Sequence, residues 1–305
     1  MSEIFRTTIL GSSAAAPTSL RHTSAQLVQY HNQRFLFDCA EGTQMQLRRF
    51  KIPLMKIEHI FISHMHGDHY LGLPGLLFTY HLLGREKDLH VYSPEGMEDI
   101  IEMQNRISML TPSFSVFYHV IEKGEQVLFE DNRIIIASIA MQHRIPAFGF
   151  LIKEKPKPRN LKKSSITKYG IPVEQMQELK SGADYMTADG KLIPNKTITK
   201  EPPPPRSFAF CSDTQYTEDF LDQIQDVDLL YHEATFMHDK ADIARQKTHS
   251  TTIEAATLAK KANAKKLLIG HYSARYKDLD AFRNEAATVF PNTSLAEEGD
   301  VIDIG

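Results

Sequence analysis

The sequence contains no tryptophan and only two cysteines in 305 residues. Cys39 and Cys211 stand far apart and form no CxxC pair, which excludes a disulfide framework and a thiolate zinc site. We expect both to be buried thiols in a reducing cytoplasm. No apolar stretch approaches the ~18 residues needed to span a bilayer, and the N-terminus has no basic start followed by an apolar signal core. We therefore expect a cytoplasmic protein without membrane contact.

The chain also lacks a strong net charge, at −3, but its charge is unevenly distributed. Residues 153–206 hold 12 Lys or Arg against 6 Asp or Glu, whereas the remainder holds 23 against 32. Eight of the fifteen prolines lie in the same segment, including "PPPP" at 202–205. One interpretation is a flexible surface insertion, and the other is an arm that holds a polyanion. Composition alone leaves both open.

Hydrophobic periodicity predicts a mixed α/β chain. The first half is rich in strand patterns and the second alternates strands with helices, which predicts packed sheets with helices in outer layers. The expected strands cover residues 5–10, 25–30, 34–40, 57–63, 89–94, 133–141, 147–154, 207–213, 228–236 (a strand, then a loop), 265–272 and 301–305. The expected helices cover residues 71–84, 96–107, 217–224, 252–264 and 279–290, with a short one within 168–182.

The motif "SHMHGDH" crowds His64, His66, Asp68 and His69 directly after the expected strand 57–63. Alternate residues of an extended chain point the same way, so His64 and His66 can share one metal. Asp68 and His69, beyond a tight turn, can serve a second metal. Imidazole and carboxylate ligands suit zinc, and also manganese or iron.

A two-metal site needs further ligands, and three candidates follow other expected strands. His143 follows strand 133–141, Asp213 follows "SFAFCS", and His271 follows "KKLLIG". A rigid sheet aims ligands best at such strand ends. Asp213 is the best candidate to bridge two metals, because a carboxylate has two oxygens.

This constellation resembles the metallo-β-lactamase superfamily, whose fold is a four-layered αββα sandwich. Further motifs are spread over nearly the whole chain: "GSSAAAPT", "FDCAEGTQMQLRR", "SHMHGDHYLGLPGLL", "SDT", "HEATF", "HST", "GHYSARY" and, in the basic segment, "GIPVEQMQELKSG". Together they resemble ribonuclease Z, the transfer-RNA 3′-processing endonuclease family. One departure is "GSSAAAP", where many members carry more glycine, and it affects no ligand.

The resemblance implies a single catalytic domain over 1–305, with 153–206 as an inserted flexible arm that grips tRNA. It implies two Zn²⁺ per subunit, one held by His64, His66, His143 and Asp213, the other by Asp68, His69, Asp213 and His271. The implied reaction removes the 3′ trailer from precursor tRNA, leaving a 3′-hydroxyl on the tRNA and a 5′-phosphate on the trailer. The implied assembly is a homodimer in which one subunit's arm holds the RNA that the other cuts. No DNA partner is expected.

The resemblance also assigns roles within the reaction. Asp68 is the expected proton acceptor, and His249 of "KTHST" can relieve charge on the leaving oxygen with Glu233 of "HEAT" as its orienting partner. The alternative for His249 is a surface histidine ahead of helix 252–264, capped by Ser250 or Thr251.

Ser273 and Arg275 follow His271 directly and are the expected phosphate contacts, although Arg275 could instead pair with a nearby acid. The loop Ser12–Thr18 could admit the substrate's 3′ stem. Met103 and Met109 are expected in the core. The other histidines, which lack ligand spacing, are expected to be structural or at the surface: residues 22, 31, 59, 81, 90, 119, 232 and 238.

Two rival functions remain. A small-molecule phosphodiesterase or arylsulfatase-like hydrolase would keep the metal site but would not need the basic segment. A protein that grips RNA and uses metals only structurally would lack a proton acceptor, whereas Asp68 and the other six ligands are all present.

Overall fold

The computed structural model describes residues 3–305, which divide into two compact units. The larger unit contains the chain up to Asp131, Ile135–Lys153 and Arg206–Gly305. The smaller unit contains Asn132–Ile134 and Glu154–Pro205.

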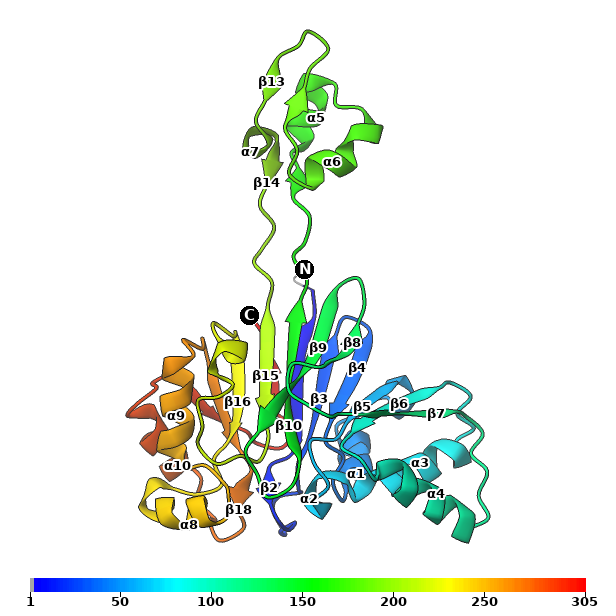
Figure 1. Cartoon of the computed structure of the whole chain (residues 1–305), viewed down its shortest axis with the longest axis vertical. Coiled ribbons are helices and arrows are strands. Elements are labelled where there is room, and N and C mark those ends of the chain that lie inside the picture. Colours follow the sequence, from blue (N-terminus) through cyan, green and yellow to red (C-terminus); the bar gives the residue numbers. More distant parts are fainter. Residues whose placement is uncertain (1–2) are drawn as a thin grey trace. The chain divides into compact units, whose positions relative to one another are not determined.

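Two seven-stranded sheets form the centre of the larger unit (Figure 1). Within the first sheet, β1, β3, β4 and β20 are antiparallel neighbours, and β4 to β7 run parallel. Its strands, in spatial order, are β20 (Val301–Asp303), β1 (Phe5–Gly11), β3 (Ala25–Tyr30), β4 (Gln33–Phe37), β5 (His59–Phe61), β6 (Leu89–Ser93) and β7 (Val116–Val120).

The second sheet has parallel pairing from β15 to β19 and antiparallel pairing between β10 and β15 and between β8 and β9. In spatial order its strands are β19 (Thr293–Leu295), β17 (Leu267–Gly270), β16 (Leu229–Glu233), β15 (Ser207–Cys211), β10 (Ala147–Glu154), β9 (Ile134–Met141) and β8 (Val127–Glu130). A small parallel pair joins β2 (Ser13–Ala14) to β18 (Tyr272–Ser273).

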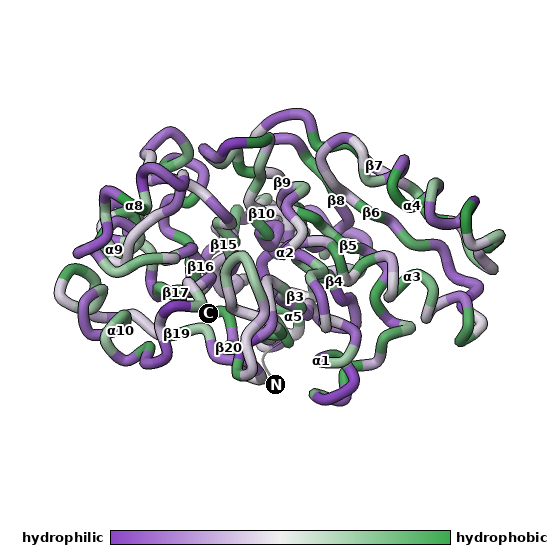
Figure 2. Tube along the Cα trace, turned by 90° about the horizontal axis from the view of Figure 1, so that it is seen from below, coloured by the Kyte–Doolittle hydropathy of each residue, from purple (hydrophilic) through white to green (hydrophobic). Residues whose placement is uncertain are grey.

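Helices cover the outer faces of both sheets. One core cluster packs the first sheet against α1, α3 and α4, and another packs the second sheet against α9 and α10. The two groups of helices lie on opposite sides of the sheets (Figure 2). The helices of this unit are α1 (Thr43–Arg49), α2 (Gly67–Tyr70), α3 (Gly72–Leu82), α4 (Met97–Ile107), α8 (Ala241–Gln246), α9 (Thr252–Lys261) and α10 (Asp280–Ala287), with 3₁₀ turns η1 (Leu54–Lys56), η3 (Leu221–Ile224) and η4 (His238–Lys240).

Phenylalanines fill the space between the two sheets. Phe37 of β4 lies 5.1 Å from Phe150 and 5.7 Å from Phe210, measured between ring centroids, and Phe61 of β5 lies 5.4 Å from Phe150. All four rings are fully buried. Such rings each bury a large apolar area and hold the sheets in a fixed relation, which fixes the loops at the strand ends. This is the αββα layering that the resemblance implies.

The smaller unit has a core of its own, formed by Ile171, Leu179, Tyr185, Ile193 and Ile198. Its secondary structure consists of β11 (Asn160–Leu161), α5 (Lys163–Tyr169), η2 (Val173–Gln175), α6 (Met176–Lys180), β12 (Tyr185–Met186), β13 (Leu192–Ile193), α7 (Asn195–Ile198) and β14 (Thr199–Lys200). The basic segment is therefore folded, although its sequence shows few long apolar runs.

Some sequence predictions are wrong in detail. A helix was expected over 217–224, but only the 3₁₀ turn η3 forms there, because the backbone at Phe220 (φ −107°, ψ 13°) is not helical and interrupts the segment. The expected helix within 168–182 is reduced to η2 and α6, since Gly170 adopts the left-handed conformation that ends α5, and Pro172 follows it. Met103 and Met109 are not in the core; they are 53% and 92% exposed.

Both cysteines are buried and unpaired, as predicted. Burial raises the pKa of both thiols, so they remain protonated. Within residues 3–305, none of the helices combines the length and hydrophobicity needed to cross a bilayer.

Candidate metal centre

The residues of the motif "SHMHGDH" and three distant strand ends meet at one place in the larger unit. His64 follows β5 of the first sheet, whereas His143, Asp213 and His271 follow β9, β15 and β17 of the second. Asp68 and His69 lie on the short helix α2, one turn beyond His66. The structure thus brings together all seven residues that the sequence predicted as metal ligands.

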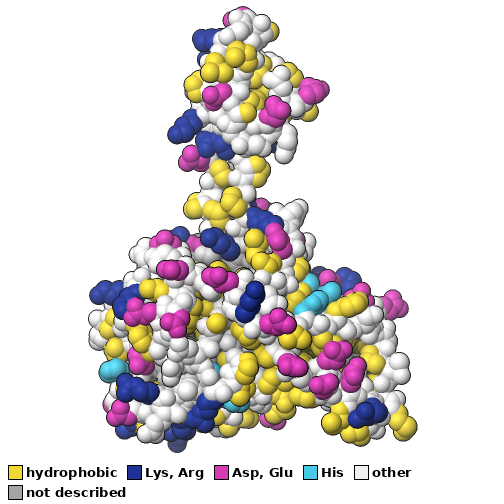
Figure 3. All heavy atoms as spheres, in the orientation of Figure 1, with side chains coloured by type: hydrophobic (Ala, Val, Ile, Leu, Met, Phe, Trp, Pro, Cys, Tyr) yellow, Lys and Arg dark blue, Asp and Glu magenta, His cyan; other side chains and the backbone are white. Residues whose placement is uncertain are grey.

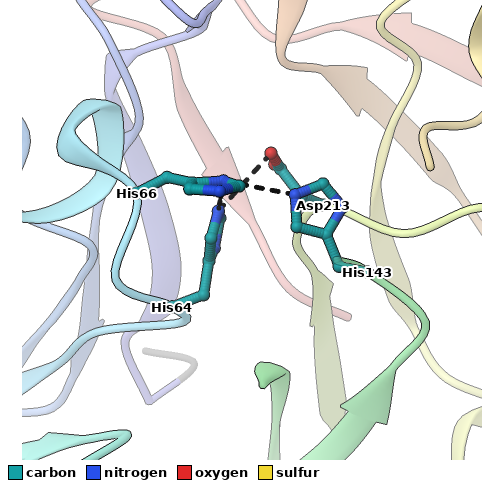
Figure 4. Close-up of side chains that lie close together, drawn as sticks. All are labelled: His64, His66, His143 and Asp213. Carbon is teal, nitrogen blue, oxygen red and sulfur yellow. Dashed lines mark hydrogen bonds and ion pairs between the residues drawn. The ribbon is translucent and has the colours of Figure 1, made fainter. Parts of the chain in front are cut away.

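The first group of ligand atoms belongs to His64, His66, His143 and Asp213 (Figure 4). His66 Nδ1 lies 3.0 Å from His64 Nε2 and 3.2 Å from His143 Nε2. Asp213 Oδ2 lies 3.6 Å from His64 Nε2. Three imidazole nitrogens and one carboxylate oxygen therefore converge, which is the donor set of a tetrahedral zinc site.

The second group belongs to Asp68, His69 and His271, with Asp213 beside it. Asp68 Oδ2 lies 3.6 Å from His69 Nε2 and 3.5 Å from His271 Nε2. Asp213 Oδ1 lies 3.4 Å and 3.1 Å from the same two nitrogens. The two oxygens of Asp213 thus face different groups, as a bridging carboxylate requires.

Three buried atoms of this centre have no hydrogen-bond partner among the described residues: His69 Nε2, His271 Nε2 and Asp213 Oδ1. A buried polar atom without a partner costs about 1–3 kcal/mol, so it is rare in a folded protein. Each of the three is a potential metal ligand, and all three lie close together in the second group. The residues present therefore fit metal ions.

Electrostatics within the centre favour bound cations. Asp213 is buried, which alone would raise its pKa, but His271, His69 and His64 together hold it well below its usual range. Burial also acts to raise the pKa of Asp68, but the neighbouring His69 and His271 outweigh burial and lower that pKa. Both carboxylates are therefore ionised near neutral pH.

The histidines of the first group are held neutral. Burial is the largest cause and lowers the pKa of His64, His66 and His143, although Asp213 acts in the opposite direction. A neutral imidazole is the form that binds a metal. His69 differs, because the carboxylates of Asp213, Asp38 and Asp68 outweigh its burial and raise its pKa.

A second set of residues orients the histidines from outside. Asp38 Oδ2 accepts from His69 Nδ1 at 2.7 Å, and the Thr248 carbonyl accepts from His143 Nδ1 at 2.9 Å. Thr235 Oγ1 lies 3.0 Å from His271 Nδ1. Because Nδ1 of each ring is engaged, Nε2 is directed to the centre.

Asp38 was missed by the sequence reasoning. It follows β4 in "FDCAEG", adopts a left-handed backbone (φ 57°), and its Oδ1 accepts from the Ser63 amide at 2.8 Å. Its position directly after a strand was the signal that could have identified it, since the same rule identified the ligands.

His249 and Glu233 lie beside the centre as a hydrogen-bonded pair. His249 Nδ1 lies 2.8 Å from Glu233 Oε1 and 3.9 Å from Asp213 Oδ2. Burial lowers the pKa of His249, but the Glu233 carboxylate outweighs it and raises that pKa to about 9. Glu233 is fixed by the amides of Thr214 and Thr235, each at 3.0 Å. The imidazole is thus protonated at neutral pH. Thr251 caps α9, with Glu254 in a capping box, as the alternative for His249 expected. His249 is nevertheless not a surface histidine, since its side chain is only 15% exposed and is paired with Glu233.

Ser273 and Arg275 lie in the loop that begins at β18. Arg275 is exposed; its Nε donates to Ser273 Oγ at 3.1 Å, and its guanidinium lies 5.0 Å from the Phe236 ring centroid. Within residues 3–305, no ion pair joins Arg275 to an acid, so its charge remains available.

The loop Ser12–Thr18 reaches the centre through its backbone. The amide of Ala15, a residue with φ 64°, donates to Asp68 Oδ2 at 2.6 Å. The neighbouring β2 pairs with β18, which places the loop beside Ser273. The loop therefore borders the metal centre.

The fold and the centre define a class of protein. Two sheets between helical layers, with histidine and aspartate at the strand ends, are the architecture of metallo-β-lactamase-fold metal-binding proteins. A protein of that fold from Bacillus subtilis, YhfI, superposes with a TM-score of 0.71 at 19% identity, covering all of both chains. A sequence model described as Anti-Pycsar protein Apyc1 matches residues 5–157, about half of the chain.

Relatives define the family more narrowly. The chain is 42% identical to ribonuclease Z of Bacteroides thetaiotaomicron over 303 residues, covering 99% of this chain and 96% of that one. The crystal structure of the short form of human tRNase Z has a TM-score of 0.71 and 28% identity, with 98% and 99% coverage. The chain belongs to the ribonuclease Z family, and its residues 5–157 also carry the pattern of the Apyc1 family.

Proposed function

We propose that this protein is a metal-dependent endoribonuclease that removes the 3′ trailer from precursor tRNA. It leaves a 3′-hydroxyl on the tRNA and a 5′-phosphate on the trailer, and it acts in the cytoplasm. One observation carries the proposal: two groups of ligands share Asp213, in a chain that belongs to the ribonuclease Z family. A phosphodiester is anionic, and a two-metal site suits its hydrolysis.

Two zinc ions are the proposed cofactors, with manganese or iron as possible substitutes. His64, His66, His143 and Asp213 would hold one ion, and Asp68, His69, Asp213 and His271 the other. Bound in this way, the ions supply positive charge for the phosphoryl oxygens and lower the pKa of a water to about 7. The protein's part is to fix the ligands and exclude other geometries.

Asp68 is the proposed proton acceptor. It is an ionised carboxylate at the edge of the centre, and the Ala15 amide holds one of its oxygens. A general base must lie within hydrogen-bonding reach of the proton that it accepts. A carboxylate at the edge of the centre can meet this requirement for the attacking water.

His249 is the proposed proton donor to the leaving oxygen. It is protonated at neutral pH by its pairing with Glu233, and it faces Asp213. Glu233 touches no ligand position itself, so its proposed role is to orient His249 and to keep it charged.

Arg275 and Ser273 are the proposed contacts to the substrate phosphate. A guanidinium can bind a phosphate in a forked geometry, and Arg275 is exposed without an acidic partner.

We propose that residues 153–206 form an inserted arm that binds the elbow of the folded tRNA through its phosphates. The support is the net charge of +6 in this segment, together with a folded unit over Glu154–Pro205. Contacts to phosphates carry no sequence information, which suits an enzyme that must accept many different tRNAs. A small ester would need no such unit, which argues against the rival small-molecule hydrolase.

We propose a homodimer formed through α3 and α4. Helix α3 buries Leu73, Leu76 and Tyr80 against the first sheet, yet it also exposes Leu82 at 67%. A helix that is apolar on all sides is normally buried on all sides. The exposed apolar side chains on and after these helices are Phe78, Leu82, Leu83, Met103, Ile107 and Met109. A second copy of the chain would cover them.

The direct test is incubation of the protein with a precursor tRNA, followed by mapping of both new ends. We expect one cut that leaves a 3′-hydroxyl on the tRNA, and we expect its loss with a chelator and its return with added zinc. Cleavage that persists after complete removal of metal would contradict the proposal. Hydrolysis of a small phosphodiester without any cleavage of the precursor would favour the rival function.

A further inference from the structure

A hollow on the helix-covered face of the first sheet carries three basic side chains. Arg6 of β1, Arg34 of β4 and Lys51 after α1 line this cavity, which has a volume of about 350 Å³. None of the metal-centre residues lines it. We call it the basic hollow.

The two arginines are neighbours across three strands. Gln29 of β3 is the register partner of both Arg6 and Arg34. Gln29 Oε1 accepts from Arg6 Nε at 3.2 Å and from Nη2 at 2.9 Å, while Gln29 Nε2 donates to the His31 carbonyl at 2.8 Å. The guanidinium of Arg6 is therefore held in place by a neutral group, and its other N–H groups remain available.

No carboxylate neutralises these charges. Arg34 donates only to the Asn32 carbonyl, at 3.2 Å, and within residues 3–305 no ion pair involves Arg6, Arg34 or Lys51. Asp303 is the register partner of Arg6 on β20, but it neither pairs with Arg6 nor lines the hollow. Burial, and then the charge of Arg6, lower the pKa of Arg34.

The residues that line the basic hollow include no aspartate or glutamate, which is unusual for this chain. Outside residues 153–206 the chain carries 32 acidic against 23 basic side chains, and the two signs are interspersed on the face shown in Figure 3. Converging cations repel one another, and a bound anion offsets that repulsion. The geometry therefore points to an anionic ligand.

Much of the remaining lining of the hollow is apolar. Its apolar side chains are Leu27, Phe50, Ile52, Pro53 and Val301. A Cβ at Gly299 would lie 2.8 Å from the Phe50 ring, so the ring packs directly on this glycine. A volume of this size is at the lower end of the range for small-molecule sites, about 300–1,000 Å³. The ligand should combine an anion with a flat, apolar part.

We propose that the basic hollow binds a nucleoside 5′-monophosphate, with its phosphate at Arg6, Arg34 and Lys51 and its base against Phe50 and Val301. The nucleotide is either free or the 5′-terminal nucleotide of an RNA strand. This site is separate from the metal centre and does not depend on the proposed function.

The test is calorimetric titration of AMP into the metal-loaded protein and into three variants. Arg34→Gln and Lys51→Gln each remove one charge from the hollow, and Lys51 is exposed, so its loss leaves the fold intact. Lys56→Gln, an exposed lysine nearby that does not line the hollow, is the matched control. We expect an AMP site that is weakened at least tenfold by the first two changes and unchanged by the third. Any AMP that binds at the metal centre should bind there equally in the wild type and in the three variants. Equal AMP affinity in all four would overturn the proposal.

Adenosine and inorganic phosphate separate the two parts of the ligand. We expect each to bind the hollow at least tenfold more weakly than AMP, and phosphate binding as tight as that of AMP would overturn the assignment of a nucleotide. Displacement of AMP by a 5′-phosphorylated pentanucleotide would identify the terminal nucleotide of an RNA, and its failure would identify the free nucleotide. At saturating precursor tRNA, Arg34→Gln should cleave at the wild-type rate, because the hollow shares no residue with the metal centre. This keeps the site distinguishable from the proposed function.

Discussion

One oxygen of Asp68, Oδ2, lies near the imidazoles of His69 and His271 and also accepts from the Ala15 amide. As a proposed metal ligand and the proposed proton acceptor, Asp68 should be the most costly carboxylate to lose. We expect Asp68→Ala to lower kcat for precursor cleavage at least ~10³-fold. Asp222→Asn, a change at an exposed aspartate of η3, should leave the rate unaltered. Normal processing by Asp68→Ala would remove the assignment.

The pairing of His249 with Glu233 predicts the pH dependence of cleavage. A proton donor must be protonated, and with its pKa raised to about 9 His249 loses its proton as the pH rises through that value. The rate should therefore fall on the alkaline side. In Glu233→Gln the attraction that raises this pKa is gone, so the alkaline fall should move to lower pH. A pH–rate profile of both proteins measures this. An unmoved alkaline limb would show that Glu233 does not set the charge of His249.

At the scale of single residues, the ligands were predictable because they follow strands in sequence. His143, Asp213 and His271 could be named from that position once the motif "SHMHGDH" had indicated a metal site. Asp38 also follows a strand, but its role as the partner of His69, like that of Thr235 toward His271, could not be predicted, since it depends on which ring nitrogen the side chain meets in space.

Among the elements, the loop between β1 and β3 depends on a residue far away in sequence. Glu298 accepts from the backbone amide of His22, and its Oε2 lies 2.9 Å from His22 Nδ1 and 2.6 Å from Gln46 Nε2. The same loop supplies the Ala15 amide that holds Asp68. Glu298 therefore holds in place the loop that contacts Asp68, the proposed proton acceptor.

Loss of that anchor should reduce the rate without loss of metal. We expect Glu298→Ala to lower kcat about tenfold or more, because small displacements of a catalytic group are costly. Metal content, measured on the purified protein, should stay at the wild-type value. The exposed neighbour Glu297 provides the control, as Glu297→Ala. A variant with reduced metal content would mean that Glu298 acts on the fold of the centre instead.

Whether a segment forms a helix or a strand was largely predictable, whereas the residues at which it begins and ends were not. The periodic segments 96–107 and 252–264 became α4 and α9 because each has one apolar stripe and a clear start. Short edge strands such as β8 and β19 were missed, since a few residues carry too little pattern without the neighbouring strand.

At the scale of the whole molecule, deletion of the smaller unit distinguishes the two candidate functions, cleavage of precursor tRNA and hydrolysis of a small phosphodiester. Replacing residues 153–206 by a short glycine-serine linker should abolish precursor tRNA cleavage while hydrolysis of bis-p-nitrophenyl phosphate continues. Removal of the charge alone, by changing several of its lysines to glutamine, should weaken RNA binding and its salt dependence together. Full precursor cleavage by the deleted protein would refute the proposed role of the arm.

The apolar surface of α3 and α4 predicts the assembly. Leu82→Glu or Ile107→Glu should convert a dimer to monomers in analytical ultracentrifugation, because a buried charge without a partner opposes association. Val127→Glu, at an exposed valine of β8, should leave the dimer intact. A wild-type protein that is monomeric at all concentrations would contradict the dimer.

The ligands of the centre come from both seven-stranded sheets, with His64 after β5 and three others after strands of the second sheet. Metal binding and folding are therefore linked equilibria. A ligand that binds only the native state stabilises it by about 2.7 kcal/mol at one hundred times its dissociation constant. The midpoint of thermal unfolding should accordingly rise with the free zinc concentration, and His64→Ala should reduce that dependence. The metal would thus contribute to the thermal tolerance of the chain as well as to its chemistry.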